Sequence, residues 1–452
     1  MKRNIDMTNG PIFGGMVAFA IPLIFSGILQ ICFNLADQIV VSNFGEPGAL
    51  ASVGSTSSLI HLFVTVFIGL SVGAQVCISH NLGAGENTFA NKHAHNAIAT
   101  SVIIGVIVAV VGFFLAPSII EHVMKTPKEA LEGAILYTRV YLAGAPAILL
   151  YNYSAAVIKT QGDTKSPFIY LLIGGVANVL LNLLFVIVFK MSVLGVAVAT
   201  VTSNVISAIL CIWYLVSREQ PCKISLRKIR IYPKEFDQIM KKGLPIALQS
   251  AAFSLSNVFI QKSVNSFGVS FVEGNAAAIN ICSFADVCNE AFGQSVLAFV
   301  GHNVGARNYK RVKKSIIVSL IFGFVMTVVI GTLIILGSDI LLSVFKLDEV
   351  GIYAAKTRFI YLILPLFIAN IMQVLSGAMR GMGKTLPPMI LTVIGVCVFR
   401  LIWIETVFPI YNTPDCVYVS YPITWVLTVI GLIGFIIPEM KKLRKKLDIN
   451  EA

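Results

Sequence analysis

The chain has 452 residues, of which 56% are hydrophobic and 12% are charged, and its mean hydropathy is +0.84. A soluble globular protein has about 25% charged residues, so this composition excludes a fold that hides its apolar side chains in a water-soluble core. The net charge of +12 does not indicate nucleic-acid binding, because no basic patch is interleaved with aromatic residues. The composition predicts a protein whose solvent is largely the lipid bilayer.

Twelve apolar runs follow one another along the chain, most of them long enough for the roughly 20 residues that a helix needs to cross the hydrocarbon layer. They show no alternation of apolar and polar residues, which a membrane-spanning β-barrel would require, so we expect helices. The first six runs are residues 13–41, 49–78, 95–115, 129–158, 167–189 and 193–217. The second six are residues 243–267, 273–300, 312–336, 352–379, 385–410 and 417–437.

The runs divide the chain into two halves. Residues 1–217 form an N-terminal six-helix half, residues 218–242 form a basic linker, and residues 243–452 form a C-terminal six-helix half with a basic tail. We therefore predict an all-α integral membrane protein with twelve transmembrane helices in two six-helix bundles. Each bundle has an even number of spans, so the two should be related by a pseudo-twofold axis along the membrane normal, with a substrate cleft between them.

The basic residues are unevenly distributed between the loops. With twelve spans, the termini and the even-numbered connections share one side of the membrane, and that side has 25 of the 34 lysines and arginines. The opposite side has only Lys125, Lys128, Lys190 and Lys346. Short cytoplasmic loops are enriched in Lys and Arg, so we expect both termini and the linker to be cytoplasmic in the plasma membrane.

The two halves also resemble each other in sequence. Five short motifs occur twice, in the same order, at offsets of 219 to 223 residues. They are Ile21-Pro22 with Leu244-Pro245, Phe44-Gly45 with Phe267-Gly268, His80-Asn81-x-Gly83-Ala84 with His302-Asn303-x-Gly305-Ala306, Thr138-Arg139 with Thr357-Arg358, and Gly162-x-Thr164-x-x-Pro167 with Gly383-x-Thr385-x-x-Pro388. Such self-similarity indicates an internal duplication. The glycines of the third and fifth motifs are expected to be left-handed helix C-caps.

These motifs resemble those of the multidrug and toxic compound extrusion (MATE) family, within a flippase superfamily that also exports lipid-linked oligosaccharides. The resemblance covers about residues 11–446. It lies in Ile21-Pro22, in Asp37 ahead of Phe44-Gly45, in Asn81-x-Gly83-Ala84, and in residues 162–165 and 195–200. It implies exchange of protons or sodium ions for organic, often cationic, compounds. We expect a monomer with no cofactor besides the coupling ion, no bound metal beyond a possible Na⁺ at Asp37, and no nucleotide or nucleic-acid partner.

Asp37 is the leading candidate for a functional residue, because an ionisable side chain within a span costs about 2.5–3.5 kcal/mol on insertion. From the helical rise, Asp37, Asn182 and Thr200 lie about 12–15 Å below the outer loops, and Asn178 about 18 Å. One carboxylate with amide and hydroxyl oxygens suits a hard cation or a proton. In the family, the matching aspartate and its neighbours on the fifth and sixth helices form an ion site, to which we add Asn34 from the face of Asp37.

The second half has a different set of polar residues. The family often has a second aspartate at the position of Asn182 and a glutamate on the seventh helix, where this chain has no acid. Coupling is therefore expected to rest on the N-terminal half. Residues that are candidates for lining the substrate cleft are Gln30, Gln249, Asn257, Gln261, Asp286 and Glu290.

Two pairs of charged residues within the spans need interpretation. Asp286 and Glu290 are four residues apart on one helix face; they either pair with Arg400 in a structural network or line the cleft and attract cations. Arg139 and Arg358 lie near the outer ends of their helices, where snorkelling to the headgroups is expected.

The sequence bears on two other function classes. A membrane-embedded enzyme would need convergent catalytic groups, and none is visible in the sequence; a nucleotide-binding motif is also absent. The closer alternative is a lipid or lipid-linked oligosaccharide flippase, which a basic cleft would favour and the intramembrane acids disfavour.

The charge asymmetry makes a testable prediction about topology. We expect a cysteine in the linker, such as the native Cys222, to react with an impermeant maleimide only after the cells are permeabilised. Reaction from outside intact cells would contradict a cytoplasmic linker.

Overall fold

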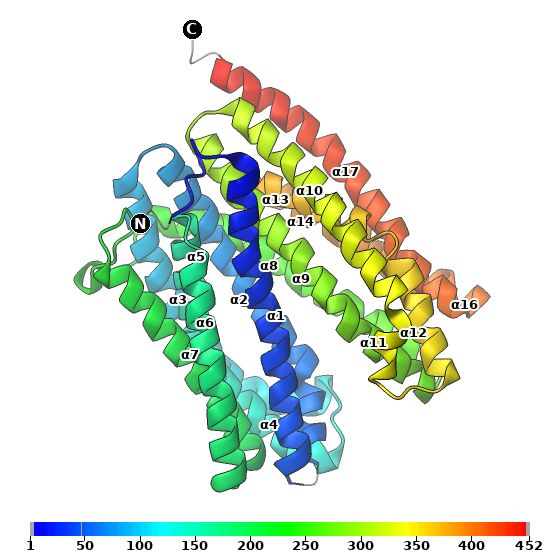
Figure 1. The fold of residues 1–452 in the computed structure, drawn as a ribbon. Coiled ribbons are helices and arrows are strands. Elements are labelled where there is room, and N and C mark those ends of the chain that lie inside the picture. Colours follow the sequence, from blue (N-terminus) through cyan, green and yellow to red (C-terminus); the bar gives the residue numbers. More distant parts are fainter. Residues whose placement is uncertain (1–3, 47, 449–452) are drawn as a thin grey trace. The chain divides into compact units, whose positions relative to one another are not determined.

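The computed structural model describes residues 4–46 and 48–448, and in this part of the chain it contains helices and no strands (Figure 1). Lys2 and Arg3, which contribute to the predicted charge asymmetry, lie outside the described residues, as do the outermost residues of the two predicted halves. Each of the twelve apolar runs coincides with a long helix or with a bent or interrupted one.

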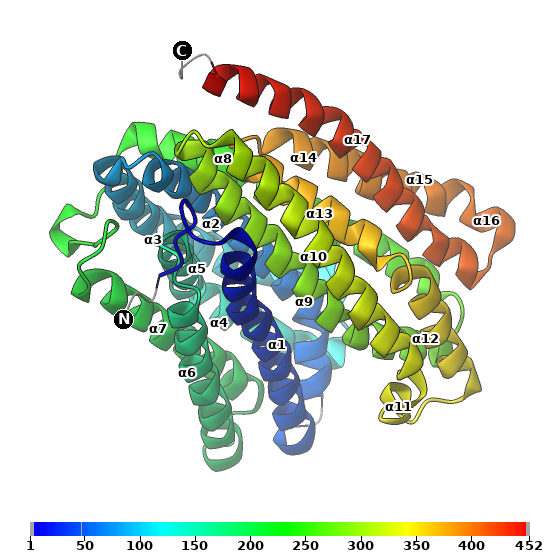
Figure 2. The same cartoon turned by 45° about the horizontal axis from the view of Figure 1, so that its top comes forward.

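The helices of the first half follow the predicted runs closely. They are α1 (Ile12–Phe44), α2 (Ala49–Gly83), α3 (Asn87–Ser118) with a π-helical turn η1 (Ile119–Val123), α4 (Lys128–Ala143), α5 (Ala145–Thr160), α6 (Lys165–Asn182) with a π-helical segment η2 (Leu183–Val188), and α7 (Ser192–Ser217). A short 3₁₀ turn η3 (Leu226–Lys228) lies in the linker. Figure 2 shows α6 and α7 side by side.

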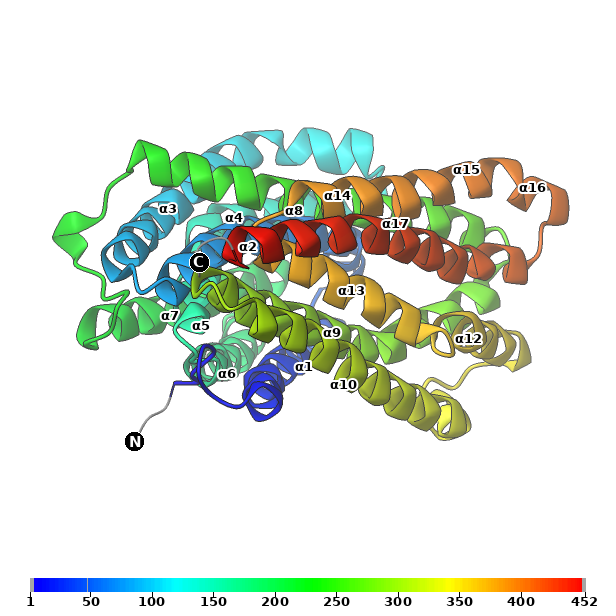
Figure 3. The ribbon, with the colours of Figure 1, turned by 90° about the horizontal axis from the view of Figure 1, so that it is seen from above.

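The second half begins with α8 (Pro233–Asn265), which starts inside the stretch predicted as a linker. It continues with α9 (Val269–Gly305), α10 (Tyr309–Leu336), α11 (Ser338–Ser343), α12 (Glu349–Leu362), α13 (Leu366–Gly381), α14 (Leu386–Thr392), η4 (Val393–Val398), α15 (Phe399–Thr406), α16 (Phe408–Tyr411) and α17 (Pro414–Asp448). Figure 3 shows α17 running along α14 and α15.

Most of these helices satisfy the length and hydropathy that a membrane span requires. Among the described residues, nine single helices do so, and the pairs α4–α5 and α12–α13 do so together, although they bend by 46° and 49°. The remaining long helix is α9, whose apolar character is interrupted by Asp286 and Glu290. The two bent pairs occupy equivalent positions in the repeat, so the bend is a property of the duplicated unit.

The compact units of the chain do not divide at the linker. One unit contains Phe25–Ala247, and the other contains Leu248 onward together with Asp6–Ile24. The boundaries thus fall inside α1 and inside α8, and the whole predicted linker belongs to the first unit. Sequence composition marks residues 218–242 as distinct, but composition does not record which helices they pack on.

Glycines allow α8 to approach α2 closely within the first unit. A Cβ atom on Gly73 would collide with the backbone of Ile239 and Gly243, and one on Gly69 would collide with the backbone of Ala247. Small residues at helix crossings let backbones come together in membrane proteins, where packing replaces the hydrophobic effect. This contact places the first part of α8 in the N-terminal unit.

The repeated turn motifs have partly different roles from those expected. Gly162 and Gly383 have φ of 81° and 79°, as predicted for left-handed C-caps. In the His-Asn-x-Gly-Ala motif the prediction is wrong, because Gly83 and Gly305 are the last residues of α2 and α9. The left-handed residues come two positions later, at Gly85 and Arg307.

The asparagine of this motif instead holds neighbouring segments. In the second unit, Asn303 Nδ2 donates to Met7 O at 2.9 Å, and the guanidinium of Arg311 donates to Asn303 Oδ1 and to Gly10 O. In the first unit, Asn81 Nδ2 lies 3.0 Å from His93 Nδ1, and His93 Nε2 lies 2.8 Å from Gln238 Oε1. The first copy thus reaches α8 through His93 and Gln238, and the second copy holds the segment that leads into α1.

The native Cys222 is a poor reporter of topology, although it lies in the linker. Its side chain is fully buried, and burial raises the pKa of its thiol to about 12, so almost no reactive thiolate is present at neutral pH. The exposed neighbour Ser225 is the better position, and the labelling test described above is best made with Ser225→Cys in a background that lacks the other cysteines.

Candidate ion-coupling site

Asp37 lies in the C-terminal part of α1 and is 7% exposed. It begins the final two turns of the helix, whose next buried residues, Val40 and Val41, belong to an apolar cluster with Val186 of η2 and Val196 of α7. This cluster leaves the carboxylate in apolar surroundings. Among the described residues, no Lys, Arg or His nitrogen lies within 4.0 Å of it.

The partners of Asp37 are the polar residues that the sequence placed at the same depth. Asn182 Nδ2 donates to Asp37 Oδ1 at 2.5 Å, and Thr200 Oγ1 is 3.3 Å from Asp37 Oδ2. Asn178 completes the network, since its Nδ2 donates to Thr200 Oγ1 at 3.3 Å and its Oδ1 accepts from Asn182 at 3.3 Å. Three helices, α1, α6 and α7, thus contribute to one cluster.

The hydrogen bonds of this cluster are incomplete. The hydroxyl of Thr200 has a single proton to share between Asp37 and Val196 O, which lies closer at 2.9 Å. Asn182 is fully buried, and its Oδ1 has no hydrogen-bond partner. A buried acceptor without a partner costs about 1–3 kcal/mol. The orphaned oxygen lies on the residue that contacts the carboxylate, so a proton or a cation at Asp37 is the natural group to satisfy it.

The cluster has the chemistry of a hard-cation or proton site. Its oxygen atoms come from one carboxylate, two amide carbonyls and one hydroxyl, all of which are ligand types for Na⁺-like cations. The same carboxylate can bind a proton instead, since an apolar environment favours its neutral form.

A π-helical segment begins directly after Asn182. π-Helical turns are rare and occur frequently at functional sites. A second π-helical segment, η4, follows Thr392 in the second half, but at the repeat offset of 221 residues it corresponds to residues 172–177 within α6 and not to η2. The sequence does not reveal these segments, because their residues are apolar and follow the pattern of an ordinary span.

Two further polar residues of α1 were singled out in the sequence, Asn34 for the ion site and Gln30 for the substrate cleft. Asn34 and Gln30 share the helix face of Asp37 in the sequence pattern, but both side chains are exposed, and neither belongs to the hydrogen-bond network of the described residues. Tyr137 of α4 was not predicted. It is buried in the same apolar cluster and lies close enough to interact electrostatically with Asp37.

The candidate cleft residues of α8 and α9 fall into three environments. Asn257, Asp286 and Glu290 are exposed. Gln261 is half-buried, donates to Asn265 at 2.8 Å and accepts from Asn275 at 3.4 Å. Gln249 is buried and lies between Thr392 and Arg380, at 3.0 and 2.8 Å, so its amide is fixed in the interior of the second unit.

Of the two interpretations of Asp286 and Glu290, pairing with Arg400 is not observed among the described residues. Arg400 is 1% exposed, donates from Nε to Thr424 at 3.1 Å, and stacks on Tyr421 with 4.0 Å between guanidinium and ring centre. Neither terminal nitrogen of Arg400 has a hydrogen-bond partner. No ion pair joins the described acids of α9 to an arginine.

The expectation that Arg139 and Arg358 both snorkel is wrong for Arg358. Its side chain is 9% exposed, donates to Asn275 Oδ1 at 3.0 Å, and lies 5.7 Å from the rings of Tyr418 and Tyr421. Arg139 is half-buried and lies over Phe113 at 5.0 Å. Aromatic faces stabilise a desolvated guanidinium, and sequence position alone does not reveal that such faces are available.

Comparison with known proteins connects this geometry to a family. The MatE family model matches the chain twice, over residues 22–184 and again over residues 245–404. The chain belongs to the MatE family, the multidrug and toxic compound extrusion transporters. The starts of the two matches differ by 223 residues, which confirms the internal duplication, and the all-α membrane architecture predicted from the sequence is confirmed as well.

The relatives of this MATE protein cover almost its full length. It is 24% identical over 434 residues to the probable multidrug resistance protein YoeA of Bacillus subtilis, and this match covers 94% of this chain and 93% of that protein. It is 28% identical over 396 residues to the probable multidrug resistance protein NorM of Thermotoga maritima, with 85% and 83% covered. The fold matches a MATE crystal structure in complex with MaL6, with a TM-score of 0.90, 23% identity and coverage of 98% and 100%.

The hydrogen bonds of Thr200 generate a prediction about stability. Thr200→Val keeps the shape of the side chain but removes the hydroxyl that contacts Asp37 and Asn178, so the free energy of unfolding should fall by about 1–2 kcal/mol. Thr200→Ser retains the hydroxyl and should stay close to the wild type. Thermal unfolding of the purified proteins in detergent measures both. Equal melting temperatures for the Val variant and the wild type would show that the hydroxyl makes no net contribution.

Proposed function

We propose that this MATE protein exports organic cations across the plasma membrane in exchange for H⁺ or Na⁺, with Asp37 as the coupling residue. The curated relatives are named multidrug resistance proteins, which supports a small-molecule substrate expelled from the cell. The proposal involves a single chain with cytoplasmic termini, no nucleotide and no cofactor besides the coupling ion.

The observation that carries the proposal is the buried carboxylate of Asp37, with no basic partner among the described residues. A lone anion in a span is unfavourable, so binding of a proton or a sodium ion removes the charge and stabilises the arrangement that binds it. A ligand shifts an equilibrium between two states only by its different affinity for them. Coupling therefore requires that the oxygens of Asp37, Asn178, Asn182 and Thr200 converge in only one of the transporter's states.

The substrate preference rests on the exposed acids of α9. Asp286 and Glu290 lie one turn apart, and neither has an ion-pair partner among the described residues. Glu290 accepts one hydrogen bond from Gln294 at 3.1 Å. Unpaired carboxylates on a helix within the spans attract organic cations, and this is why a cationic substrate is proposed.

A second candidate is the transport of molecules that bear phosphate or carboxylate, including lipid-linked ones. The observation in its favour is the pair of buried arginines of the second unit, Arg358 and Arg400, which share the ring of Tyr421 and have unsatisfied nitrogens. The two candidates are separated by comparing the uptake of a labelled ethidium-like cation into proteoliposomes with the uptake of a labelled lipid-linked sugar.

The proposal predicts the behaviour of a neutral variant. The side chain of Asp37→Asn resembles a carboxyl group that is permanently neutral, so the protein should fold and bind substrate. Export against a gradient should fall at least about tenfold, which corresponds to about 1.4 kcal/mol of coupling free energy. Export by cells and by proteoliposomes, normalised to protein in the membrane, measures the effect.

Matched controls come from the acids that the proposal assigns to substrate. Asp286→Asn and Glu290→Gln also remove one negative charge each, and they should alter the apparent substrate affinity rather than the dependence on the ion gradient. Export by Asp37→Asn at nearly the wild-type rate would make the coupling role of Asp37 untenable and would direct attention to α9.

A further inference from the structure

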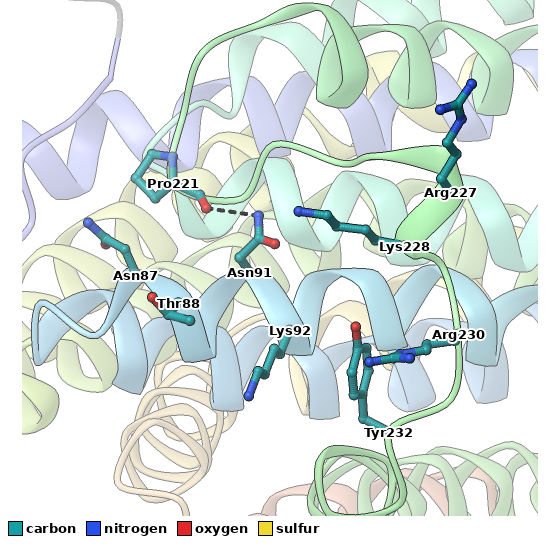
Figure 4. A pocket seen from close by; sticks show the side chains of 9 residues that line it. All are labelled: Asn87, Thr88, Asn91, Lys92, Pro221, Arg227, Lys228, Arg230 and Tyr232. Carbon is teal, nitrogen blue, oxygen red and sulfur yellow. Dashed lines mark hydrogen bonds between the residues drawn. The ribbon is translucent and has the colours of Figure 1, made fainter.

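A cavity of about 630 Å³ lies in the first unit, between the start of α3 and the linker. Figure 4 shows it from close by: Lys228 extends toward Asn91, and Arg230 lies beside the ring of Tyr232. Four of the residues that line it are basic, namely Lys92, Arg227, Lys228 and Arg230, and none of the lining residues is acidic.

These four cations have no acidic partner among the described residues. The linker does form ion pairs elsewhere, because Lys223 pairs with Glu219 and Lys241 pairs with Asp237. Both of those pairs lie one helical turn apart in sequence and outside the cavity. The four lining cations instead concentrate positive charge around one hollow, and such focusing raises the local concentration of anions.

The linker is folded onto α3 by specific hydrogen bonds. Asn91 Nδ2 donates to Pro221 O and Lys223 O at 3.2 and 2.8 Å, and the amide of Ser225 donates to His95 Nε2 at 2.9 Å. Asn96 Nδ2 donates to Tyr232 O at 3.3 Å. A loop that only sets topology needs basic composition and not a fixed shape, so the topological role of these charges does not account for the anchoring.

The first turn of α3 adds a second source of positive potential. The helix begins at Asn87, and its N-cap residue Glu86 makes no side-chain hydrogen bond to the helix. The first residues of α3 line the cavity. In this first turn the amides of Asn87 and Ala90 donate to Gly85 O and Glu86 O, so the amides of Thr88 and Phe89 are the ones that can bind an anion, and the helix dipole favours negative charge there.

Apolar side chains on the same elements point to a membrane surface. Leu226, next to Arg227 in η3, is 64% exposed, and Phe89, in the first turn of α3, is 49% exposed. Exposed leucine and aromatic residues interspersed with Lys and Arg are typical of segments at the headgroup level. The charge asymmetry places this face on the cytoplasmic side, where anionic lipids are concentrated.

We propose that this cavity binds the phosphate group of an anionic phospholipid headgroup from the cytoplasmic leaflet. Lys92, Lys228 and Arg230 surround the phosphate together with the N-terminus of α3, while Leu226 and Phe89 contact the lipid. The site is separate from Asp37, so a bound lipid stabilises the folded linker and the start of α8 whether or not the transporter is cycling.

The test measures lipid binding and does not depend on transport. The protein is purified in detergent and titrated with phosphatidylglycerol, with phosphatidylcholine as the uncharged comparison, and its melting temperature is recorded. Phosphatidylglycerol should raise the melting temperature of the wild type, and phosphatidylcholine should not. The variant Lys92→Gln/Arg227→Gln/Lys228→Gln/Arg230→Gln should require at least about tenfold more of this lipid for the same shift.

A matched control removes charge from the equivalent region of the second half. Arg307, Lys310, Lys313 and Lys314 are four exposed cations at or just before the start of α10 and are not among the residues that line this cavity, so their replacement by Gln should leave the titration almost unchanged. Equal losses in the two variants would overturn the proposal in favour of general surface attraction. The absence of any shift with phosphatidylglycerol in the wild type would overturn it as well.

A second titration, with water-soluble phosphates, tests whether the bound phosphate belongs to a lipid. Inorganic phosphate and a water-soluble glycerophosphate are titrated at the same ionic strength in the absence of added lipid. They should stabilise the protein far less than phosphatidylglycerol. Stabilisation by the soluble phosphates that equals that of the lipid, and that the four-residue variant loses, would overturn the assignment to a lipid headgroup.

Discussion

The hydrocarbon layer contains no water to solvate charge, and this constraint governs most of what the polar residues of the chain do. Asp37 is the clearest case, because its carboxylate is buried among valines and is met by one amide and one hydroxyl rather than by a cation. Such an arrangement is stable only while the charge is compensated. The same cost that makes Asp37 expensive to fold makes ion binding there favourable, and this links stability to function.

Residues at equivalent positions of the two duplicated halves lie in different surroundings. Thr138-Arg139 and Thr357-Arg358 are copies of one motif, but Arg139 lies half-buried over Phe113 whereas Arg358 is buried with Asn275. The acid and amide cluster occurs in the first half, and buried arginines occur in the second. The duplicated helices therefore bury different charged groups in the two halves, a carboxylate in the first and guanidinium groups in the second.

The sequence predicted the spans, the repeat and the members of the Asp37 cluster, because helical rise and periodicity fix depth and face along a single helix. Asn178, Asn182 and Thr200 were found in this way from their distances to the outer loops. Asn34 lies outside the hydrogen-bond network of Asp37 among the described residues, since sharing a helix face does not ensure contact with a neighbouring helix. The partners of Arg358, the π-helical turn after Asn182 and the packing of the start of α8 on α2 depend on tertiary contacts, which no local pattern encodes.

The central claim is that one coupling ion binds at Asp37. The most direct measurement is ion binding to the purified protein without substrate, followed as Na⁺ bound and, in weakly buffered solution, as protons taken up when the pH is lowered. The account predicts that the wild type binds either Na⁺ or H⁺ with a stoichiometry of about one ion per chain. It also predicts that Asp37→Asn, equally folded, has lost that binding. Undiminished ion binding by Asp37→Asn would contradict the account.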